Sequence, residues 1–218
     1  RLCRDWSSDV CSSDLLDRDG TINEETGYMD RLEKLKLVPV AAEAIRLINA
    51  SGMKAVVVTN QSGVARGLFD EAFVDAVHTR LREMLRAEGA FLDGIYFCPH
   101  HPTEGRERYL MTCDCRKPAP GLLLRAAADL HLDPDRSYMV GDTLKDIEAG
   151  ARAGARGVLV RTGYGSESAA ALSPGEETGR KLPGEKGQSS RESVIFRPVH
   201  IAEDVLAAVQ WILRNLRP

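Results

Sequence analysis

The chain has 218 residues, of which 43% are hydrophobic and 28% are charged, and its net charge is −3. This length and composition predict one substantial globular domain, and the slightly negative charge argues against nucleic acid as a partner. No apolar run approaches the roughly 18 residues of a membrane-spanning helix, so no membrane partner is expected. The five cysteines are odd in number and unevenly spaced, which argues against a disulfide framework and favours a reducing cytoplasm.

The first 14 residues depart from the rest of the sequence. They contain the near-repeat WSSDV and CSSDL without a usable hydrophobic period, and we interpret residues 1–14 as a non-native or disordered leader. Cys3 and Cys11 are therefore discounted as functional residues. A buried parallel strand is normally a continuous Val, Ile and Leu run, but only two leucines precede the first motif. Whether this strand forms is open, and residues 15–218 are expected to form a single domain.

Helical and strand patterns alternate along this domain. Strands are expected over 53–60, 94–99, 137–142 and 193–198, and a strand with a loop is expected over 156–165. Helices are expected over 38–52, 70–88, 119–132, 143–154 and 201–216, the last with Trp211 in the core. Residues 166–192 are rich in Gly, Ser, Pro, Glu and Lys and are expected to form a flexible loop. The alternation predicts an α/β fold, a Rossmann-like doubly wound parallel sheet with helices on both faces.

Asp17 and Asp19 stand two residues apart, directly before a Gly-Thr pair. Asp before Gly is ordinary turn chemistry, which is the simplest explanation of this stretch. A calcium loop does not fit, because its register places Leu15 and Thr26 where acidic ligands are required. The functional alternative is a nucleophilic carboxylate that shares a magnesium ion with a phosphate.

Polar residues also follow the later strands. Thr59 and Asn60 close the second strand, Asp142 follows the fourth, and Lys117 lies just before a helix. Taken singly, these are a turn, a helix cap and a surface lysine. The carboxyl ends of parallel strands meet at one edge of the sheet, where ligands of such folds bind. Together with the two aspartates, these residues therefore indicate a site for phosphoryl transfer.

The chemistry suggests a role for each group. Asp17 would attack phosphorus and form an aspartyl-phosphate. Asp19 would protonate the leaving alkoxide and then accept a proton from water, and nearby negative charge should raise its pKa. Thr59 and Lys117 would hold the transferring phosphoryl oxygens.

A magnesium ion needs hard oxygen ligands. Asp17, the backbone carbonyl of Asp19 and Asp142 are the expected ligands. Asp146, one helical turn after Asp142, would support the site by orienting water or Lys117.

Four cysteine and histidine residues form a second candidate metal site. A C-x-H pair and a C-x-C pair are separated by 12 residues. Three thiolates and one imidazole form a closed tetrahedral zinc shell, so this zinc would be structural. The expected ligands are Cys98, His100, Cys113 and Cys115, with His101 as a rival for the imidazole position.

The stretches DRDGTIN, TNQSGVARG, CRKP and GDTLKDIEAG resemble the four motifs of the haloacid dehalogenase (HAD) superfamily of phosphohydrolases. The resemblance covers residues 15–165. Within this superfamily the chain is similar to the heptose bisphosphate and histidinol-phosphate phosphatases. The resemblance implies a HAD-like fold without a large cap domain, with a zinc loop at 98–115 over the active site. It also implies a magnesium-dependent, monomeric, cytoplasmic phosphatase.

The same resemblance implies the substrate, a small phosphorylated sugar. The implied reaction removes the 7-phosphate of D-glycero-D-manno-heptose 1,7-bisphosphate, which supplies heptose for bacterial lipopolysaccharide. Histidinol phosphate is the alternative substrate. A zinc-stabilised binding scaffold, catalytically impaired through a damaged first strand, is the alternative from another class.

A bisphosphorylated substrate needs a cationic contact beyond the reacting phosphate. Arg116 is the natural candidate because guanidinium binds phosphate bidentately, and zinc bound at Cys115 would fix its direction. Arg66, Arg106 and Arg108 are further candidates. The substrate-binding residues that the resemblance implies are Glu25, Thr26, Gly27, Tyr28, Thr59, Asn60, Gln61, Ser62, Arg116 and Lys117.

Overall fold

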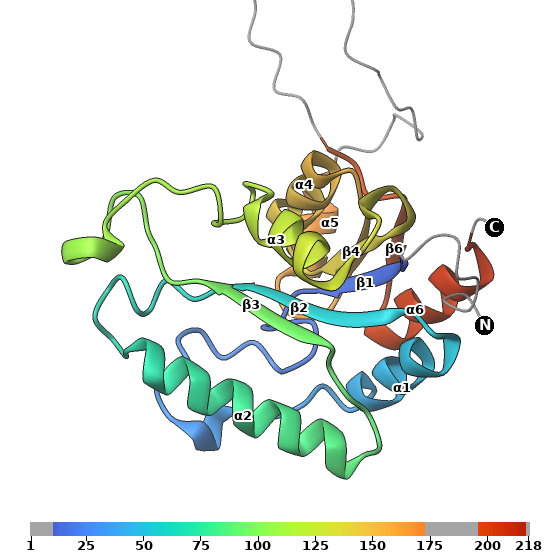
Figure 1. The fold of residues 1–218 in the computed structure, drawn as a ribbon, viewed down its shortest axis with the longest axis horizontal. Coiled ribbons are helices and arrows are strands. Elements are labelled where there is room, and N and C mark those ends of the chain that lie inside the picture. Colours follow the sequence, from blue (N-terminus) through green and yellow to red (C-terminus); the bar gives the residue numbers. More distant parts are fainter. Residues whose placement is uncertain (1–10, 173–195, 217–218) are drawn as a thin grey trace, which may run out of the picture.

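Six parallel strands form the centre of the computed structural model, which describes residues 11–172 and 196–216 (Figure 1). The order across the sheet is β3-β2-β1-β4-β5-β6, so the chain starts near the middle and winds outward in both directions. The strands are β1 (Ser13–Leu16), β2 (Lys54–Asn60), β3 (Gly94–Cys98), β4 (Tyr138–Gly141), β5 (Arg156–Val160) and β6 (His200–Ala202). This order confirms the predicted doubly wound α/β fold.

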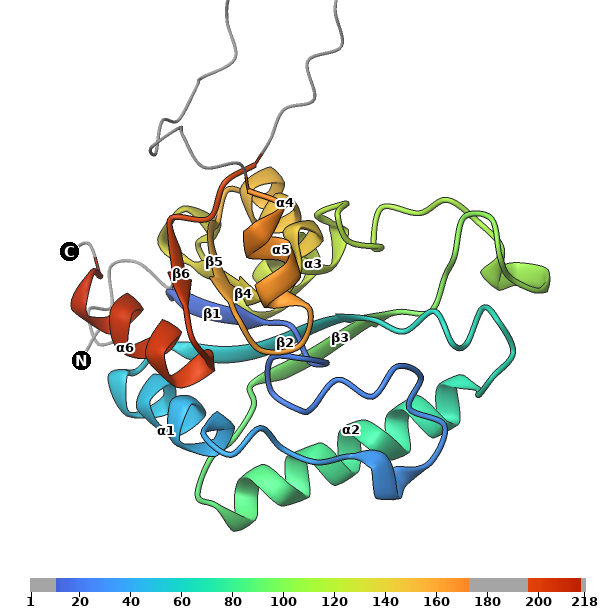
Figure 2. The same ribbon diagram turned by 180° about the vertical axis from the view of Figure 1, so that it is seen from behind.

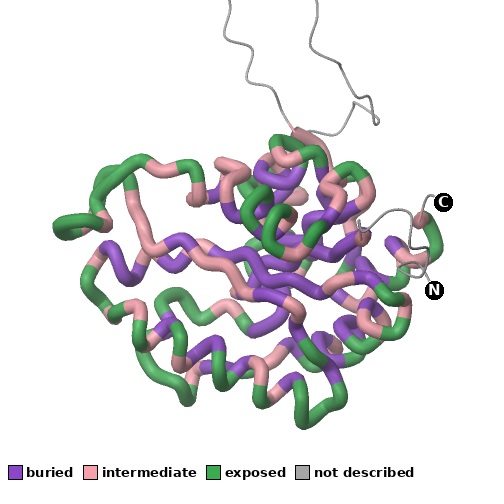
Figure 3. The backbone as a smooth tube through the Cα atoms, in the orientation of Figure 1, coloured by how far each residue is buried: buried purple, intermediate pink, exposed green. Residues whose placement is uncertain are grey.

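Helices cover both faces of the sheet, as the two opposite views show (Figures 1 and 2). One face is covered by α1 (Ala41–Ser51), α2 (Glu71–Ala87) and α6 (Val205–Arg214). The other face is covered by α3 (Gly121–Leu130) and α4 (Leu144–Ala153). The central strands are buried along most of their length, while the outer sides of the helices are exposed (Figure 3). Short 3-10 helices lie at Leu32–Lys34, Glu107–Tyr109 and Pro134–Arg136.

Capping residues set the helix boundaries. α2 begins after Asp70, whose carboxylate accepts a hydrogen bond from the Phe73 amide at 2.8 Å. α1 and α4 end at Gly52 and Gly154, with φ of 82° and 97°, a conformation that glycine adopts most readily. In the described part of the chain, no helix has the length and apolar character that crossing a membrane requires.

Residues 11–14 belong to the fold, which corrects their assignment to a leader. Ser13 and Asp14 form the first half of β1, which pairs with β2 on one side and β4 on the other. Ser13 is accommodated because its amide and hydroxyl bond to the Ser137 hydroxyl at 3.2 and 2.9 Å. The strand forms despite its polar side chains because ladder hydrogen bonds join backbone groups. Residues 1–10 lie outside the described part of the chain.

Asp14 is the unusual residue of this strand. Its side chain is fully buried, and neither carboxylate oxygen has a hydrogen-bond partner among the described residues. Because side chains alternate along a strand, Asp14 faces the same apolar layer as Leu16, under α1 and α6. Burial raises the pKa of Asp14 to about 7. Ionisation of this carboxyl near neutral pH therefore opposes folding.

Two expectations in the last third of the chain are corrected. The final strand of the described residues is β6 at 200–202, and residues 196–198 of the strand expected at 193–198 are not in a strand. Pro198 lacks an amide donor for a ladder hydrogen bond, and pairing starts after it, with the Val199 amide bonded to the Gly157 carbonyl at 2.8 Å. Helix α5 (Gly165–Ala170) occupies the start of the expected loop. The expectations for 173–195 fall outside the described residues.

The helix expected over 201–216 is shorter, because β6 takes its first residues. Its Trp211 packs against the core as expected. The indole stacks on the imidazole of His200, with ring centroids 4.6 Å apart. This contact joins α6 to the edge strand.

Candidate active site

A cleft of about 340 Å³ opens at the carboxyl ends of β1, β2 and β4. The register pairs Leu16 with Val57 and Val140, so the residues that follow these strands meet at one level. Thr26 is the expected substrate residue that does not line the cleft. The expected residues that do are Asp17, Asp19, Glu25, Gly27, Tyr28, Thr59, Asn60, Gln61, Ser62, Arg116, Lys117, Asp142 and Asp146.

Lys117 lies buried at the base of this cleft. Its Nζ is 2.7 Å from Asp17 Oδ1 and 2.6 Å from Asp146 Oδ1. A third contact at 2.7 Å reaches the carbonyl of Val58 in β2. Burial opposes the charge of Lys117, but the charges of Asp146 and Asp17 outweigh it and raise the pKa of the ammonium above its usual value. Lys117 is therefore a fixed cation between two carboxylates.

The carboxylates of Asp17, Asp142 and Asp146 lie close together. One ligand oxygen from each lies within 4.8 Å of the others. Burial is the main reason why the pKa of Asp17 rises to about 8 and that of Asp142 to about 7. The Tyr164 amide donates to Asp142 Oδ2 at 2.8 Å, while buried Oδ1 has no partner among the described residues. A buried acidic group with an unpaired oxygen is a fitting environment for a hard divalent cation.

The carboxylate of Asp19 has different hydrogen-bond partners from that of Asp17. Its carboxylate accepts hydrogen bonds from Arg18, Asn23 and Gln61 at 2.9 to 3.1 Å. Burial alone would raise the pKa of Asp19, but the Arg18 charge and the hydrogen bonds outweigh it, so the pKa is lowered. The expected rise is therefore wrong for the ligand-free site, because a buried arginine lies beside the acid.

The side chains of two expected substrate-binding residues form hydrogen bonds with other residues of the chain. The Asn60 side chain accepts from the Lys117 amide and donates to the Lys117 carbonyl, both at 3.1 Å. Gln61 Nε2 donates to Thr59 Oγ1 at 3.0 Å as well as to Asp19. Asn60 thus fixes the backbone that carries the lysine, and Gln61 joins the ends of β1 and β2.

The segment after β1 forms one wall of the cleft. Glu25, Gly27 and Tyr28 line it, and burial raises the pKa of Glu25. The Arg66 guanidinium lies 5.7 Å from the centre of the Tyr28 ring. This contact joins the wall to the loop that follows β2.

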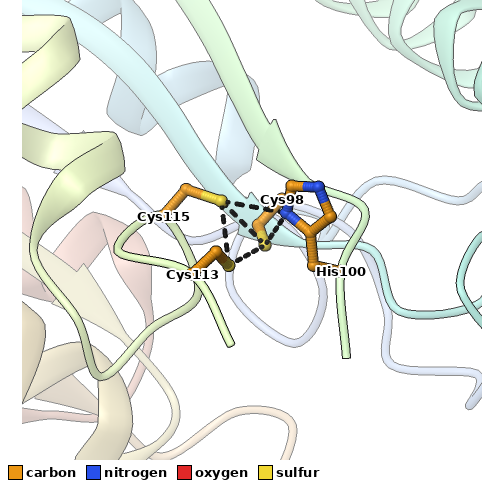
Figure 4. Close-up of side chains that lie close together, drawn as sticks. All are labelled: Cys98, His100, Cys113 and Cys115. Carbon is orange, nitrogen blue, oxygen red and sulfur yellow. Dashed lines mark hydrogen bonds between the residues drawn. The ribbon is translucent and has the colours of Figure 1, made fainter. Parts of the chain in front are cut away.

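The four expected zinc ligands converge at one point (Figure 4). The Cys115 sulfur lies 3.2 Å from both other sulfurs and 3.3 Å from His100 Nδ1. Cys98 comes from the end of β3, so the loop from 98 to 115 closes on itself. Three thiols and one ring nitrogen within such distances match the donor set of a closed tetrahedral zinc site.

His101 does not join this cluster, so His100 is the histidine that the structure places beside the three cysteines. Its Nδ1 accepts from the Glu104 amide at 2.9 Å, and its Nε2 lies 3.4 Å from Arg66 Nη2. Arg66 also forms an ion pair with Glu104. Of the expected arginines only Arg116 lines the cleft, and it donates to the His100 carbonyl at 3.1 Å.

Several residues of the site were not expected from the sequence. Arg18, Lys145 and Tyr164 line the cleft, and His78 contacts Arg18 from α2. The sequence could have indicated a role for Arg18, because a cation between two aspartates either offsets their negative charge or points away from them. No such signal exists for the others, since a surface lysine, a loop tyrosine and a helical histidine are common in any sequence.

A buried carboxylate paired with a lysine, beside two more aspartates, lies at the switch point of a doubly wound sheet. This combination of fold and site defines the class of phosphohydrolases with a HAD-like fold. A HAD-hydrolase-like family model matches residues 114–180.

Similar proteins of known name identify a family within this class of phosphohydrolases. The chain is 42% identical over 207 residues to D-glycero-D-manno-heptose-1,7-bisphosphate 7-phosphatase of Thermosynechococcus vestitus, covering 93% of this chain and 96% of the relative. It is 47% identical over 150 residues to D-glycero-beta-D-manno-heptose-1,7-bisphosphate 7-phosphatase of Escherichia coli K12, covering 68% of this chain and 78% of the relative. The chain belongs to the HAD-like phosphatase family that includes these heptose bisphosphate phosphatases.

A solved structure agrees with this assignment. The crystal structure of D,D-heptose 1,7-bisphosphate phosphatase from B. bronchiseptica, complexed with magnesium and phosphate, matches with a TM-score of 0.74 and 31% identity. The match covers 93% of this chain and 98% of that chain. The arrangement of strands and helices is therefore that of the family.

Proposed function

We propose that the protein removes the 7-phosphate of D-glycero-D-manno-heptose 1,7-bisphosphate through an aspartyl-phosphate on Asp17. The observation that carries this proposal is the buried contact of 2.7 Å between Lys117 and Asp17 at the end of β1. A carboxylate held beside a fixed cation is suited to attack a phosphoryl group, because the cation offsets the charge that accumulates there. The names of the relatives support the choice of substrate.

In the first step, an Asp17 oxygen attacks phosphorus, and the bond from phosphorus to the sugar oxygen breaks. Asp19 gives a proton to that leaving oxygen. A phosphate dianion beside Asp19 would raise the pKa of this carboxyl from its lowered value, because like charges disfavour ionisation. Lys117 and Thr59 bind the phosphoryl oxygens.

In the second step, Asp19 takes a proton from water, which attacks the phosphorus of the aspartyl-phosphate. The acyl phosphate bond breaks, inorganic phosphate leaves, and Asp17 is regenerated. Asp146 keeps Lys117 in place throughout, through their contact of 2.6 Å. This division of labour explains why both aspartates of DRDG are needed.

Magnesium fits the buried carboxylates. Asp17 and Asp142, together with the backbone carbonyl of Asp19, are the proposed ligands. The unpaired and buried Oδ1 of Asp142 supports this choice. When bound, the ion supplies positive charge that keeps the carboxylates ionised and offsets the charge of the phosphate.

Zinc at the Cys/His cluster is proposed to act on substrate binding and to leave the chemistry to the aspartates. His100 provides a ligand nitrogen, and its carbonyl accepts from Arg116 at 3.1 Å. Fixing His100 therefore fixes the direction of the Arg116 guanidinium. Arg116 is proposed to bind the second phosphate, with Glu25, Gly27, Tyr28 and Ser62 around the sugar.

A cytoplasmic location is proposed for this enzyme because a thiolate zinc site needs reduced cysteines, and Cys98, Cys113 and Cys115 form no disulfide. Its monomeric state stays a prediction that size-exclusion chromatography with light scattering would test.

The test is phosphate release from heptose 1,7-bisphosphate and from histidinol phosphate, with magnesium, by the wild type and by Asp17→Asn. We expect the bisphosphate to be turned over by the wild type alone, since an amide is a far weaker nucleophile than a carboxylate. Preference for histidinol phosphate would overturn the substrate and leave the mechanism intact. No release from either, in folded and zinc-loaded protein, would favour the binding-scaffold alternative.

A further inference from the structure

Arg18 is a buried cation directly behind the proposed acid. Its side chain is 2% exposed and forms an ion pair with the Asp19 carboxylate through two guanidinium nitrogens. Nη2 lies 2.9 Å from both carboxylate oxygens, and Nε lies 3.1 Å from Oδ1. Asn23 and Gln61 complete the set of donors around Asp19, so Arg18 is its only charged contact among the described residues.

His78 contacts the far side of this guanidinium. It comes from α2, is 7% exposed, and has its Nε2 3.3 Å from Arg18 Nη1. Arginine has donors and no acceptor, so Nε2 must accept the hydrogen bond and the ring proton must lie on Nδ1. Burial first, and then the Arg18 charge, lower the pKa of His78 to about 3, so the ring is neutral.

We propose that His78 is a positioning residue for the acid and base Asp19, acting through Arg18. This inference rests on the proposed function, in which Asp19 protonates the leaving oxygen. A neutral acceptor satisfies Nη1 without competing for the charge of Arg18, so Nε and Nη2 stay directed at Asp19. The alternative is that His78 merely fills space beside Phe97, whose ring it meets edge-on at 5.6 Å.

The leaving group separates these two roles. A sugar alkoxide is a poor leaving group and needs the proton from Asp19, whereas p-nitrophenolate leaves as a stable anion and needs little help. The parameter to compare is kcat/KM, which reports formation of the aspartyl-phosphate. A displaced Asp19 should therefore slow heptose 1,7-bisphosphate much more than p-nitrophenyl phosphate.

Four variants complete the design. His78→Leu removes the acceptor, and His78→Gln keeps a neutral one. His78→Glu adds a charge that competes with Asp19 for Arg18. His200→Leu is the matched control, because this histidine lies on β6 and stacks on Trp211 away from the cleft. Folding is checked by thermal unfolding and by zinc content.

We expect His78→Leu and His78→Glu to lower kcat/KM for the bisphosphate about tenfold, part of the roughly 10²- to 10⁴-fold that a general acid contributes. For His78→Gln and His200→Leu, kcat/KM for the bisphosphate should stay within about threefold of the wild-type value. All four variants should retain the wild-type kcat/KM for p-nitrophenyl phosphate. Equal losses on both substrates, or no loss in His78→Glu and His78→Leu, would overturn the inference. If His78→Leu does not fold, the comparison of Glu with Gln still decides. A wild type without phosphatase activity would instead overturn the proposed function.

Discussion

Gly20 and Gly163 lie against the carboxylate of Asp142 with no room for a side chain. A Cβ on either would come within 2.2 Å of Asp142 Oδ2, and their φ angles are +76° and +55°. The glycine in DRDG is therefore required by both its conformation and its contact. Because Asp142 is a proposed magnesium ligand, these glycines shape the metal site without contributing a ligand.

Gly163→Ala should weaken magnesium binding, because the added methyl group must displace Asp142 or the backbone around it. We expect the magnesium concentration for half-maximal activity to rise about tenfold or more, equal to about 1.4 kcal/mol. Gly89→Ala is the matched control, since Gly89 has a similar φ of +73° and its nearest neighbour is a flexible arginine side chain at 3.7 Å. Equal magnesium requirements in the two variants would contradict the prediction.

For single residues, the sequence was sufficient to predict the polar side chains that follow the ends of strands. It placed Asp17, Lys117 and Asp142 in one site, and the structure brings them together. It missed the lowered pKa of Asp19 because the direction of the Arg18 side chain depends on packing against α2. It did not predict that Asn60, which lines the cleft as expected, also bonds to the backbone of Lys117, because the sequence does not show that the chain returns 57 residues later to this amide.

Among the strands and helices, β1 contains the least favourable buried group, the unpaired carboxyl of Asp14. Asp14→Asn keeps the shape of the side chain and removes its charge. The variant should therefore be more stable at pH 8 by roughly 4 kcal/mol, as a pKa rise from 3.8 to about 7 implies. The pKa is raised in the folded state, so the penalty is absent below pH 4 and grows as pH rises to about 7. Urea unfolding at pH 5 and pH 8 measures this, and a gain independent of pH would contradict the prediction.

The zinc loop offers a test of the link from His100 to Arg116. Cys113→Ser, or removal of zinc by a chelator, should raise KM for heptose 1,7-bisphosphate about tenfold, the loss of one charge-assisted contact. The KM for p-nitrophenyl phosphate, which has no second phosphate, should change little. An equal rise for both substrates would show that the loop acts on the whole cleft.

Element prediction succeeded wherever periodicity and capping agreed. Asp70, Gly52 and Gly154 mark helix ends in both the sequence and the structure. β6 was displaced because a three-residue edge strand has too little sequence for a period of two to appear. α5 was missed because Ser168 holds it through the Asp142 carbonyl at 2.9 Å, a tertiary contact that the local sequence does not reveal.

For the whole molecule, clustered carboxylates predict how stability depends on pH. Asp17 and Asp142 have folded-state pKa values of about 8 and about 7, above the unfolded value of 3.8. The folded state therefore binds more protons between these values, and stability of the metal-free protein should fall as pH rises from about 5 to 8. Magnesium binds the ionised carboxylates, so the rise in Tm on adding it should be larger at pH 8 than at pH 6.

Thermal unfolding with magnesium or with a chelator, at each pH, measures this difference. Asp142→Asn is the control, because it removes one titrating ligand and should reduce the magnesium effect at pH 8. A magnesium effect that is the same at both pH values would contradict the carboxylate ligands.

The parallel sheet has a practical consequence for handling the protein. All described strands point the same way, so the cleft lies at their carboxyl ends, while β1 begins at Ser13 on the opposite edge. The chain returns to that edge after α6, where the Asn215 carbonyl accepts from the Tyr138 hydroxyl at the start of β4 at 3.2 Å. Attachment to a sensor surface by the side of the molecule that carries Ser13 and Asn215 should therefore leave the cleft facing the solution.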